Sequence, residues 1–390
     1  MAEIKYICEN GVLTLSLEGR IDSVSAPLIG GEIDNILSGN AYDSVVIDAD
    51  KLEYISSAGL RVILKLRRAE PTLKIVNASI EVYDIFDMTG FCEMMPVEKA
   101  YRKLSVDGCP VIGRGAKGTV YRYNGDTVVK VYNDSGSLSD IIKERVLARR
   151  AFVLGIPTAI SYDIVKVGDK YGSVFELLDA NSYSKLISED MEHIDEYIAD
   201  FASTLKLIHS TAVTSSDIPN IKDYILDGLE LTRNCLGDAA YEKLKRLIID
   251  VPSPKTMLHC DYHTNNVMRQ NGETMLIDMD RISHGHPVFE LANIHMTYVV
   301  FGENDPTVVE NFLGIPYDTA KYIWKKFLEC YLGTTDEARL ADVERKTCVL
   351  SYLRLIRRSV KGRSDDDMVL ANYGASKIRE LLRDVDTLDF

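Results

Sequence analysis

The sequence lacks the segments that would carry a chain into or across a membrane. No apolar run approaches the roughly 18 residues that a transmembrane helix needs. The first residues, MAEIKYICENG, lack the charged and then apolar pattern of a secretory leader. We therefore expect a cytoplasmic protein with no membrane partner. Internal repeats and low-complexity tracts are also missing, which excludes a repeat array.

The sequence has fewer basic than acidic residues, and its cysteines lack the spacing of a metal site. There are 45 Lys and Arg against 59 Asp and Glu, giving a net charge of −14, so we expect no nucleic-acid partner. This charge is compatible with a cationic substrate, and it is also ordinary for a cytosolic protein. The seven cysteines are scattered, without Cys-x-x-Cys or Cys/His metal spacing, which predicts reduced thiols. At 390 residues, the chain is long enough for two or three domains with real cores.

The first part of the chain, residues 1–103, alternates between strand and helix patterns. Apolar and polar residues alternate over 11–17, and short apolar runs at 44–48 and 74–76 are typical of buried strands. Helical periodicity appears between these runs and again over 82–88. Strands alternating with helices predict a small α/β domain.

Four segments of this part resemble the STAS domain, the fold of bacterial anti-sigma factor antagonists: Leu17–Asp22, Val46–Asp48, Tyr54–Leu60 and Ile85–Phe91. The resemblance implies a protein partner and a serine, phosphorylated by a partner kinase, at a helix start. Ser57 matches that serine, but Ser56 replaces the Asp that precedes it in the family. A phosphate on Ser57 would meet free N–H groups of the helix start. Alternatively, both serines only cap the helix.

The second part, residues 104–390, opens with a glycine-rich sequence, Ile112–Tyr121, after a break near Pro110. A dinucleotide-binding turn would need a helix after the glycines. Here an Asn124-Gly125 turn leads into an apolar strand over 127–132, which predicts a β-hairpin. The pattern therefore favours a kinase-type loop whose backbone N–H groups reach phosphate oxygens.

Lys130 stands inside that strand, where an unpaired ammonium group would be costly. In kinases such a lysine bridges the phosphates of ATP and a helix glutamate. Glu144, in the helix expected over about 139–154, is our choice of partner. The alternatives are a lysine that extends its charge to solvent and a solvated surface glutamate.

The stretch His259–Asp280, HCDYHTNNVMRQNGETMLIDMD, contains the closest grouping of candidate functional residues. Asp261 and Asn266 have the spacing of a kinase catalytic loop, in which the Asp orients a hydroxyl and the Asn binds Mg²⁺. Asp278 follows an apolar strand and offers a second hard oxygen ligand. The alternative is a polar loop with solvated acids.

With the downstream HPVFELA, this stretch resembles the core of the aminoglycoside phosphotransferase and choline kinase superfamily. The resemblance implies a bilobal, protein-kinase-like α+β fold, with an N-lobe over about 104–178 and a helical C-lobe over about 179–390. It implies ATP and Mg²⁺ as cofactors, Asp261 as the catalytic residue, and Asn266 and Asp278 as metal ligands. Cys260 stands where the family has Gly. The implied ATP-binding residues are Gly113, Gly115, Gly118, Val120, Lys130, Glu144, Glu176 and Leu178, the last two through main-chain contacts with adenine.

The residues beyond the catalytic stretch are less informative. Asp280 is expected either to support the metal or acceptor site or to pair with Arg281 or Arg269. Glu290 is expected to anchor the catalytic loop, and His209 to be a packed or capping residue. The tail predicts helices at 322–332, 341–360 and 375–388. The acidic run 365–367 reads as a solvated loop or, alternatively, as a patch for a cationic acceptor.

Three functions follow from these predictions. The first is an ATP- and Mg²⁺-dependent phosphotransferase that acts on a hydroxyl of a small molecule and carries a regulatory STAS domain. The second is a Ser/Thr kinase of a partner switch that acts on Ser57. The third is a non-catalytic scaffold that senses nucleotide.

Overall fold

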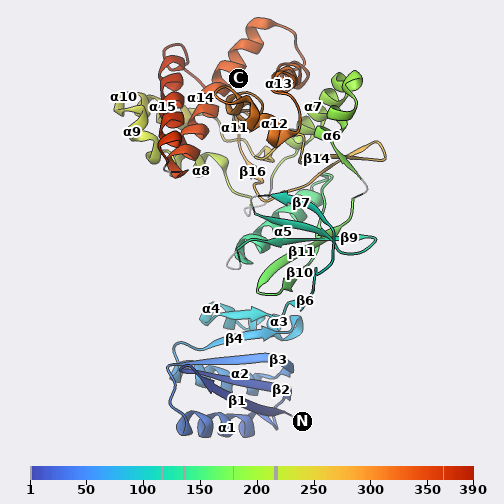
Figure 1. The fold of residues 1–390 in the computed structure, drawn as a ribbon. Coiled ribbons are helices and arrows are strands. Elements are labelled where there is room, and N and C mark those ends of the chain that lie inside the picture. Colours follow the sequence, from blue (N-terminus) through green and yellow to red (C-terminus); the bar gives the residue numbers. More distant parts are fainter. Residues whose placement is uncertain (1, 116, 135–137, 179, 215–217, 363) are drawn as a thin grey trace. The chain divides into compact units, whose positions relative to one another are not determined.

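A computed structural model describes residues 2–115, 117–134, 138–178, 180–214, 218–362 and 364–390 of the chain (Figure 1). These residues form two compact units. One consists of Met1–Ser105 with Ile164–Asp169, and the other of Val106–Asp163 with Lys170–Phe390. Each unit has its own hydrophobic core. Among the described residues, no helix is long and apolar enough to cross a membrane.

The first unit contains a five-stranded sheet in the order β1-β2-β3-β4-β5, antiparallel between β1 and β2 and otherwise parallel. The alternation in β2 buries Leu13, Leu15 and Leu17, as the sequence predicts. The elements in chain order are β1 (Glu3–Glu9), β2 (Val12–Ile21), α1 (Ala26–Gly39), β3 (Ser44–Ile55), α2 (Ser57–Ala69), β4 (Lys74–Ala78), α3 (Ile80–Met88), α4 (Phe91–Met94) and β5 (Val97–Lys99). This is the predicted α/β domain.

Two strands of this sheet were not expected from the sequence. Strand β1 is almost entirely exposed, so it shows no alternation, and an ion pair between Lys5 and Glu18 of β2 (2.9 Å) ties it to the sheet. Strand β5 has only three residues, too few to show a period. Helix α2 packs close to the sheet because Gly59 has no side chain. A Cβ there would lie 2.6 Å from Ile55 Cγ1 and 2.7 Å from Ile21 Cγ2.

A six-stranded sheet, in the order β6-β10-β11-β9-β8-β7, follows in the chain. The predicted hairpin between β8 and β9 is confirmed, and Asn124 Oδ1 closes its turn by accepting from the N–H groups of Asp126 (2.9 Å) and Thr127 (2.8 Å). The elements are β6 (Arg102–Lys103), β7 (Val111–Gly115), β8 (Gly118–Arg122), β9 (Thr127–Tyr132), α5 (Leu138–Val153), β10 (Ser161–Val167) and β11 (Lys170–Glu176).

The rest of the second unit is mainly helical, which completes the predicted bilobal α+β fold. Its α-helices and strands, in chain order, are β12 (Asn181–Ser182), α6 (Tyr183–Glu189), α7 (Ile194–Ser210), α8 (Ile221–Asp227), α9 (Arg233–Leu236), α10 (Asp238–Asp250), β13 (Met257–Leu258), β14 (Val267–Gln270), β15 (Glu273–Leu276), β16 (Ser283–His284), α11 (Val288–Tyr298), α12 (Pro306–Leu313), α13 (Tyr317–Leu332), α14 (Glu337–Gly362) and α15 (Asp365–Leu381). Short 3-10 turns lie at Met191–His193, Glu230–Thr232 and Val300–Gly302.

The acidic run 365–367 is a helix start rather than the loop that the sequence suggested. Ser364 caps α15 by accepting from Asp367 N (3.1 Å), and the Asp367 carboxylate accepts from Ser364 N (3.1 Å). Three carboxylates in the first turn interact favourably with the helix dipole. The predicted helix at 375–388 therefore begins ten residues earlier, at Asp365, and ends at Leu381.

His295 in α11 makes the second unit sensitive to acid. Its ring is 3% exposed, lies 3.0 Å from Ser351 Oγ through Nδ1, and packs against Trp324. Burial lowers the pKa of His295 from 6.5 to about 3. At a pH between these two pKa values, the His295 ring is protonated in the unfolded chain but neutral in the folded chain. Stability should therefore fall as pH drops below 6.5, by up to about 1.4 kcal/mol per pH unit.

A His295→Gln variant should show a shallower loss of melting temperature between pH 6.5 and 4 than the wild type. Gln keeps a hydrogen-bonding group near Ser351 but does not titrate. His193→Gln, at an exposed position, serves as the control and should leave the slope nearly unchanged. Equal slopes in the wild type and His295→Gln would contradict this assignment.

Candidate active site

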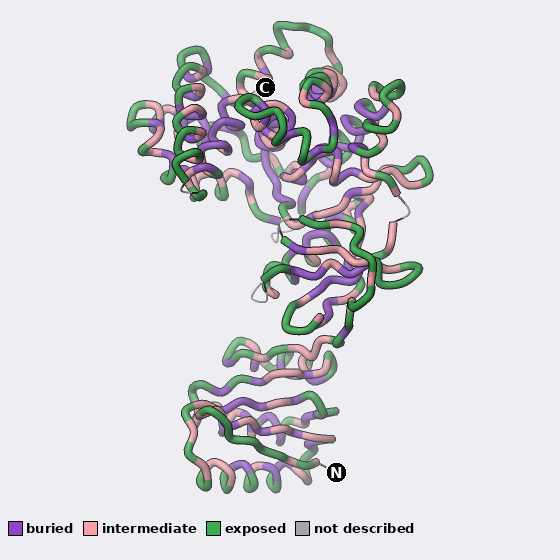
Figure 2. Tube along the Cα trace, in the orientation of Figure 1, coloured by how far each residue is buried: buried purple, intermediate pink, exposed green. Residues whose placement is uncertain are grey.

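The loop that carries Asp261 is held from within the core by Glu290 of α11. This glutamate is fully buried, and its two carboxylate oxygens accept from His259 N (2.6 Å) and Cys260 N (2.7 Å). His209 packs beside it with Nε2 3.5 Å from Oε2, a contact without hydrogen-bond geometry. Figure 2 shows the mostly buried trace from β13 to α11. Glu290 therefore anchors the loop, and His209 is a packed residue, as the sequence predicts.

Asp261 and Asn266 lie at the two ends of this loop and are joined through the backbone. Asn266 Nδ2 donates to Asp261 O (3.0 Å), and Asp261 N donates to His259 Nδ1 (3.2 Å). Among the described residues, no hydrogen bond engages the Asp261 carboxylate or Asn266 Oδ1. These oxygens are therefore available for an acceptor hydroxyl and for a cation. Cys260 has φ +63°, a conformation that favours glycine and explains the glycine of the family pattern.

Lys130 of β9 joins two acidic groups that are distant in sequence. Its Nζ lies 3.1 Å from Glu144 Oε1 and 3.1 Å from Asp278 Oδ1. Burial lowers the pKa of Lys130, but the carboxylates of Asp278 and Glu144 outweigh that effect, and the pKa is raised. The remaining Glu144 oxygen accepts from Tyr132 OH (3.1 Å), a contact that the sequence did not predict.

Asp278 follows β15 in a left-handed backbone conformation, with φ +61°. For a residue with a side chain this conformation is strained, and such strain is typical of functional positions. Burial raises the pKa of Asp278, but the ammonium groups of Lys130 and Lys117 lower it below its usual range. The carboxylate is therefore ionised at neutral pH and can act as a metal ligand.

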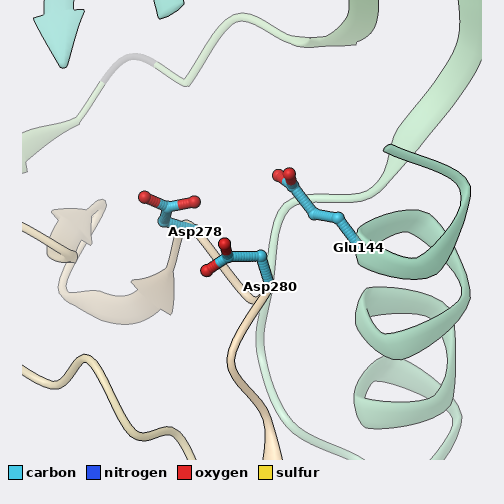
Figure 3. Close-up of side chains that lie close together, drawn as sticks. All are labelled: Glu144, Asp278 and Asp280. Carbon is cyan, nitrogen blue, oxygen red and sulfur yellow. The ribbon is translucent and has the colours of Figure 1, made fainter. Parts of the chain in front are cut away.

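Glu144, Asp278 and Asp280 bring their carboxylates together, as Figure 3 shows. One oxygen from each lies within 4.8 Å of the others, and Asp280 Oδ1 is buried without a hydrogen-bond partner. One buried and two half-buried carboxylates this close together fit a hard divalent cation such as Mg²⁺. Glu144 is the least available of the three because Lys130 and Tyr132 already occupy it.

Asp280 lies in the acidic cluster, in agreement with the first of its two predicted roles, but it does not form the predicted ion pair with an arginine. The strand ends at Leu276, so Asp278 and Asp280 are not on one side of a strand. Asp280 pairs with Lys117 of the glycine-rich turn, and neither of the predicted arginines is its partner. Arg269 pairs instead with Glu196 (3.4 Å) and Asp200 (3.6 Å). Sequence reasoning passed over Lys117, although a lysine inside a phosphate-binding loop was a usable signal.

The glycine-rich sequence forms the turn between β7 and β8. Gly113 and Gly115 lie on β7, and Gly118 opens β8 with Val120 two residues later. Only Gly118 is sterically required, because a Cβ there would lie 2.3 Å from Val131 O. The predicted adenine-binding segment follows β11. Leu177 N donates to Asp126 O (2.8 Å), and the adenine contacts of the Glu176 and Leu178 main chain stay a prediction.

The two serines of the first unit have different environments. Ser56 is the N-cap of α2, and its Oγ accepts from Gly59 N (3.4 Å). Ser57 is the first residue of the helix and is exposed. No hydrogen bond engages its hydroxyl among the described residues. Of the two serines, therefore, only Ser56 caps α2.

Comparison with known proteins identifies both parts of the chain. A model of the phosphotransferase enzyme family matches residues 108–318, and a STAS domain model matches residues 3–104. The BtrV protein of Bordetella bronchiseptica, which carries the name of an anti-sigma factor antagonist, is 33% identical over 92 residues. That match covers 23% of this chain and 78% of BtrV.

Two solved structures are among those that match the chain. The ADP-bound aminoglycoside phosphotransferase APH(2'')-Ib is 17% identical, with a TM-score of 0.47, over 77% of this chain and 96% of its own. A choline/ethanolamine kinase family protein from Mesorhizobium loti is 13% identical, with a TM-score of 0.45, over 71% of this chain and 88% of its own. The family assignment rests on the family models and on BtrV.

Proposed function

The chain belongs to the phosphotransferase enzyme family and has a STAS domain at its N-terminus, and on that premise we propose that it transfers the γ-phosphate of ATP to a hydroxyl group of a small molecule. We place the boundary between the STAS domain and the phosphotransferase domain near residues 103–104. Seven free cysteines support a reducing, cytoplasmic location.

The observation that carries the proposal is the contact of Lys130 with both Glu144 and Asp278, at 3.1 Å each. Residues 148 positions apart in sequence meet in the arrangement that phosphoryl transfer requires. Lys130 would bind the phosphates, and Glu144 would hold its ammonium group in place. Asn266 and Asp278 would hold Mg²⁺, with Asp280 as a further carboxylate.

The chemistry of the chain's own residues is mostly positioning. Asp261 accepts the hydrogen bond, and then the proton, of the acceptor hydroxyl. The acceptor oxygen forms its bond to the γ-phosphorus while the bond to the bridging oxygen of ADP breaks, so ADP leaves with the electron pair. Bound Mg²⁺ would supply charge neutralisation of the phosphate oxygens. The glycine-rich turn would cover the phosphates of bound ATP and limit the access of water to them.

Two alternatives involve the STAS domain. In the first, the exposed Ser57 hydroxyl is itself the acceptor and the protein is a Ser/Thr kinase of a partner switch. In the second, the phosphotransferase domain only senses nucleotide and the STAS domain binds a protein. The unengaged oxygens of Asp261 and Asn266 favour catalysis over sensing, because a pure sensor has no need of a free catalytic carboxylate.

The test determines which molecule receives the γ-phosphate of ATP. Purified protein incubated with Mg·ATP should release ADP slowly, with water as the phosphate acceptor, and faster once a suitable hydroxyl compound is added; EDTA should abolish the release until Mg²⁺ is restored. Intact-mass spectrometry of the same sample should show an unchanged mass, because the acceptor is a free molecule. One added phosphate that Ser57→Ala removes would establish the Ser/Thr kinase instead. ATP binding without any ADP release, also after a panel of hydroxyl compounds is added, would support the sensor and contradict the proposal.

A further inference from the structure

We propose that strand β1 is the contact surface between two copies of this chain, which pair edge to edge through their STAS domains. This pairing is independent of the proposed reaction. In the part of the chain that the structure describes, β1 (Glu3–Glu9) ends the five-stranded sheet, and no strand pairs with its outer edge. Such an edge offers a row of free N–H and C=O groups to another strand.

The turn that follows β1 determines which of its backbone groups face outwards. Asn10 and Gly11, with φ of +51° and +76°, form a two-residue turn, and Glu9 pairs with Val12 across it. Positive φ at both positions is typical of a type I′ turn, which closes on a hydrogen-bonded pair. Successive residues of an antiparallel strand direct these groups to opposite sides. The outward N–H and C=O groups therefore belong to Cys8, Tyr6 and Ile4.

The side chains of β1 alternate between the two faces of the sheet. Ile7 lies opposite Thr14 of β2, on the face away from the buried leucines of that strand. Lys5 lies on the same face, opposite Ser16. Ile7 is 62% exposed, and Tyr6 on the other face is 50% exposed. A seven-residue edge strand with two large apolar side chains in solvent is a predicted site of strand pairing.

The charges of β1 select one register for two antiparallel copies related by a two-fold axis. A pairing centred on Ile7 places each Lys5 opposite Glu9 of the other copy. A pairing centred on Tyr6 would place Glu3 opposite Glu9, and one centred on Lys5 would place two lysines opposite each other. Opposite charges across two strands are stabilising, and like charges are destabilising. The register centred on Ile7 is therefore favoured.

The same register satisfies the backbone. It places Tyr6 opposite Cys8 of the other copy, and the N–H and C=O groups of both residues point outwards. Ile7 and its counterpart then form a pair without backbone hydrogen bonds, in which the Cα atoms are about 4.5 Å apart and the side chains are closest. The residues that pair are Lys5–Glu9 of each strand. Because this contact is small, we expect a weak dimer, with a Kd of roughly 10–100 µM.

Sedimentation equilibrium of the full chain, at concentrations that span this Kd, should show a reversible monomer–dimer equilibrium. Ile7→Lys should raise Kd at least about 10-fold, because it places two ammonium groups opposite each other in the closest pair. Val24→Lys is the matched control, because Val24 is 79% exposed in the same unit but lies outside the sheet. Both variants should melt like the wild type, since neither side chain is buried. A monomer at every concentration, or equal Kd values in the two variants, would overturn the proposal.

Disulfide formation tests the register in a second measurement. Ile7→Cys and Glu3→Cys, each combined with Cys8→Ser, both place a thiol at an exposed position on the same face of β1. Only at Ile7 does the counterpart lie within the Cα separation that a disulfide spans. Mild oxidation should therefore give a covalent dimer of Ile7→Cys and not of Glu3→Cys. Equal crosslinking of both variants, or none of Ile7→Cys, would contradict the pairing.

Discussion

Replacing Asp261 with Asn is expected to lower kcat for phosphoryl transfer by about 10²- to 10⁴-fold, the usual contribution of a positioned acid–base group. The two hydrogen bonds at Asp261 that hold the loop together involve its backbone N and O, so Asn preserves them. What the substitution removes is the negative carboxylate that takes the acceptor proton. KM for ATP should stay within about twofold of wild type, because Lys130 and the glycine-rich turn are untouched.

Asp250→Asn, at an exposed position at the end of α10, provides the matched control with the same loss of charge. Steady-state ADP release measured across a range of ATP concentrations separates kcat from KM. Full activity in Asp261→Asn would show that another group takes the proton. A large rise in KM for ATP with unchanged kcat would make Asp261 a nucleotide-binding residue instead.

Glu290→Ala is expected to destabilise the phosphotransferase domain by about 3–5 kcal/mol. The substitution leaves the N–H groups of His259 and Cys260 buried without acceptors and opens a cavity against His209. In a domain of this size the loss corresponds to a fall of roughly 10 °C in melting temperature. Glu290→Gln should lose about half as much, because one of its two side-chain atoms can still accept.

Thermal unfolding at neutral pH checks this order, with Glu273→Gln in the exposed turn of β15 as the control. We expect Glu290→Gln to lose activity as well as stability, since the loop that it holds carries Asp261. A variant with normal stability and low activity would show instead that Glu290 acts in the reaction directly. Normal values of both would contradict its role as an anchor.

The local structure around the candidate site could be predicted from the sequence where neighbouring residues decide it. The hairpin that carries Lys130 follows from the Asn124-Gly125 turn, and the spacing of Asp261 and Asn266 is fixed within one loop. Glu144 could be chosen because a single helix follows the strand of Lys130. The family pattern also carried backbone information, since the position of Cys260 is normally glycine and has a positive φ.

Contacts between segments that are far apart in the sequence could not be predicted from the sequence. The pairing of Lys117 with Asp280 joins residues more than 160 positions apart, and no periodic pattern connects them. The acidic run 365–367 was misread for a different reason: Ser364 and Asp367 have the spacing of a capping box, a local signal that the sequence offered and that the interpretation passed over.

The ion pair between Lys117 and Asp280 has a consequence for the order in which ligands enter. The lysine supplies a positive charge to the acidic cluster, so a cation arriving alone must compete with it for Asp280. A nucleotide attracts Lys117 to its phosphates and thereby releases that carboxylate. Cation and nucleotide should thus each raise the affinity of the other, by the same factor, because linkage between two binding sites is reciprocal. Without ligands, Lys117 neutralises Asp280, and we expect it to leave this carboxylate only when the cation and the nucleotide bind together.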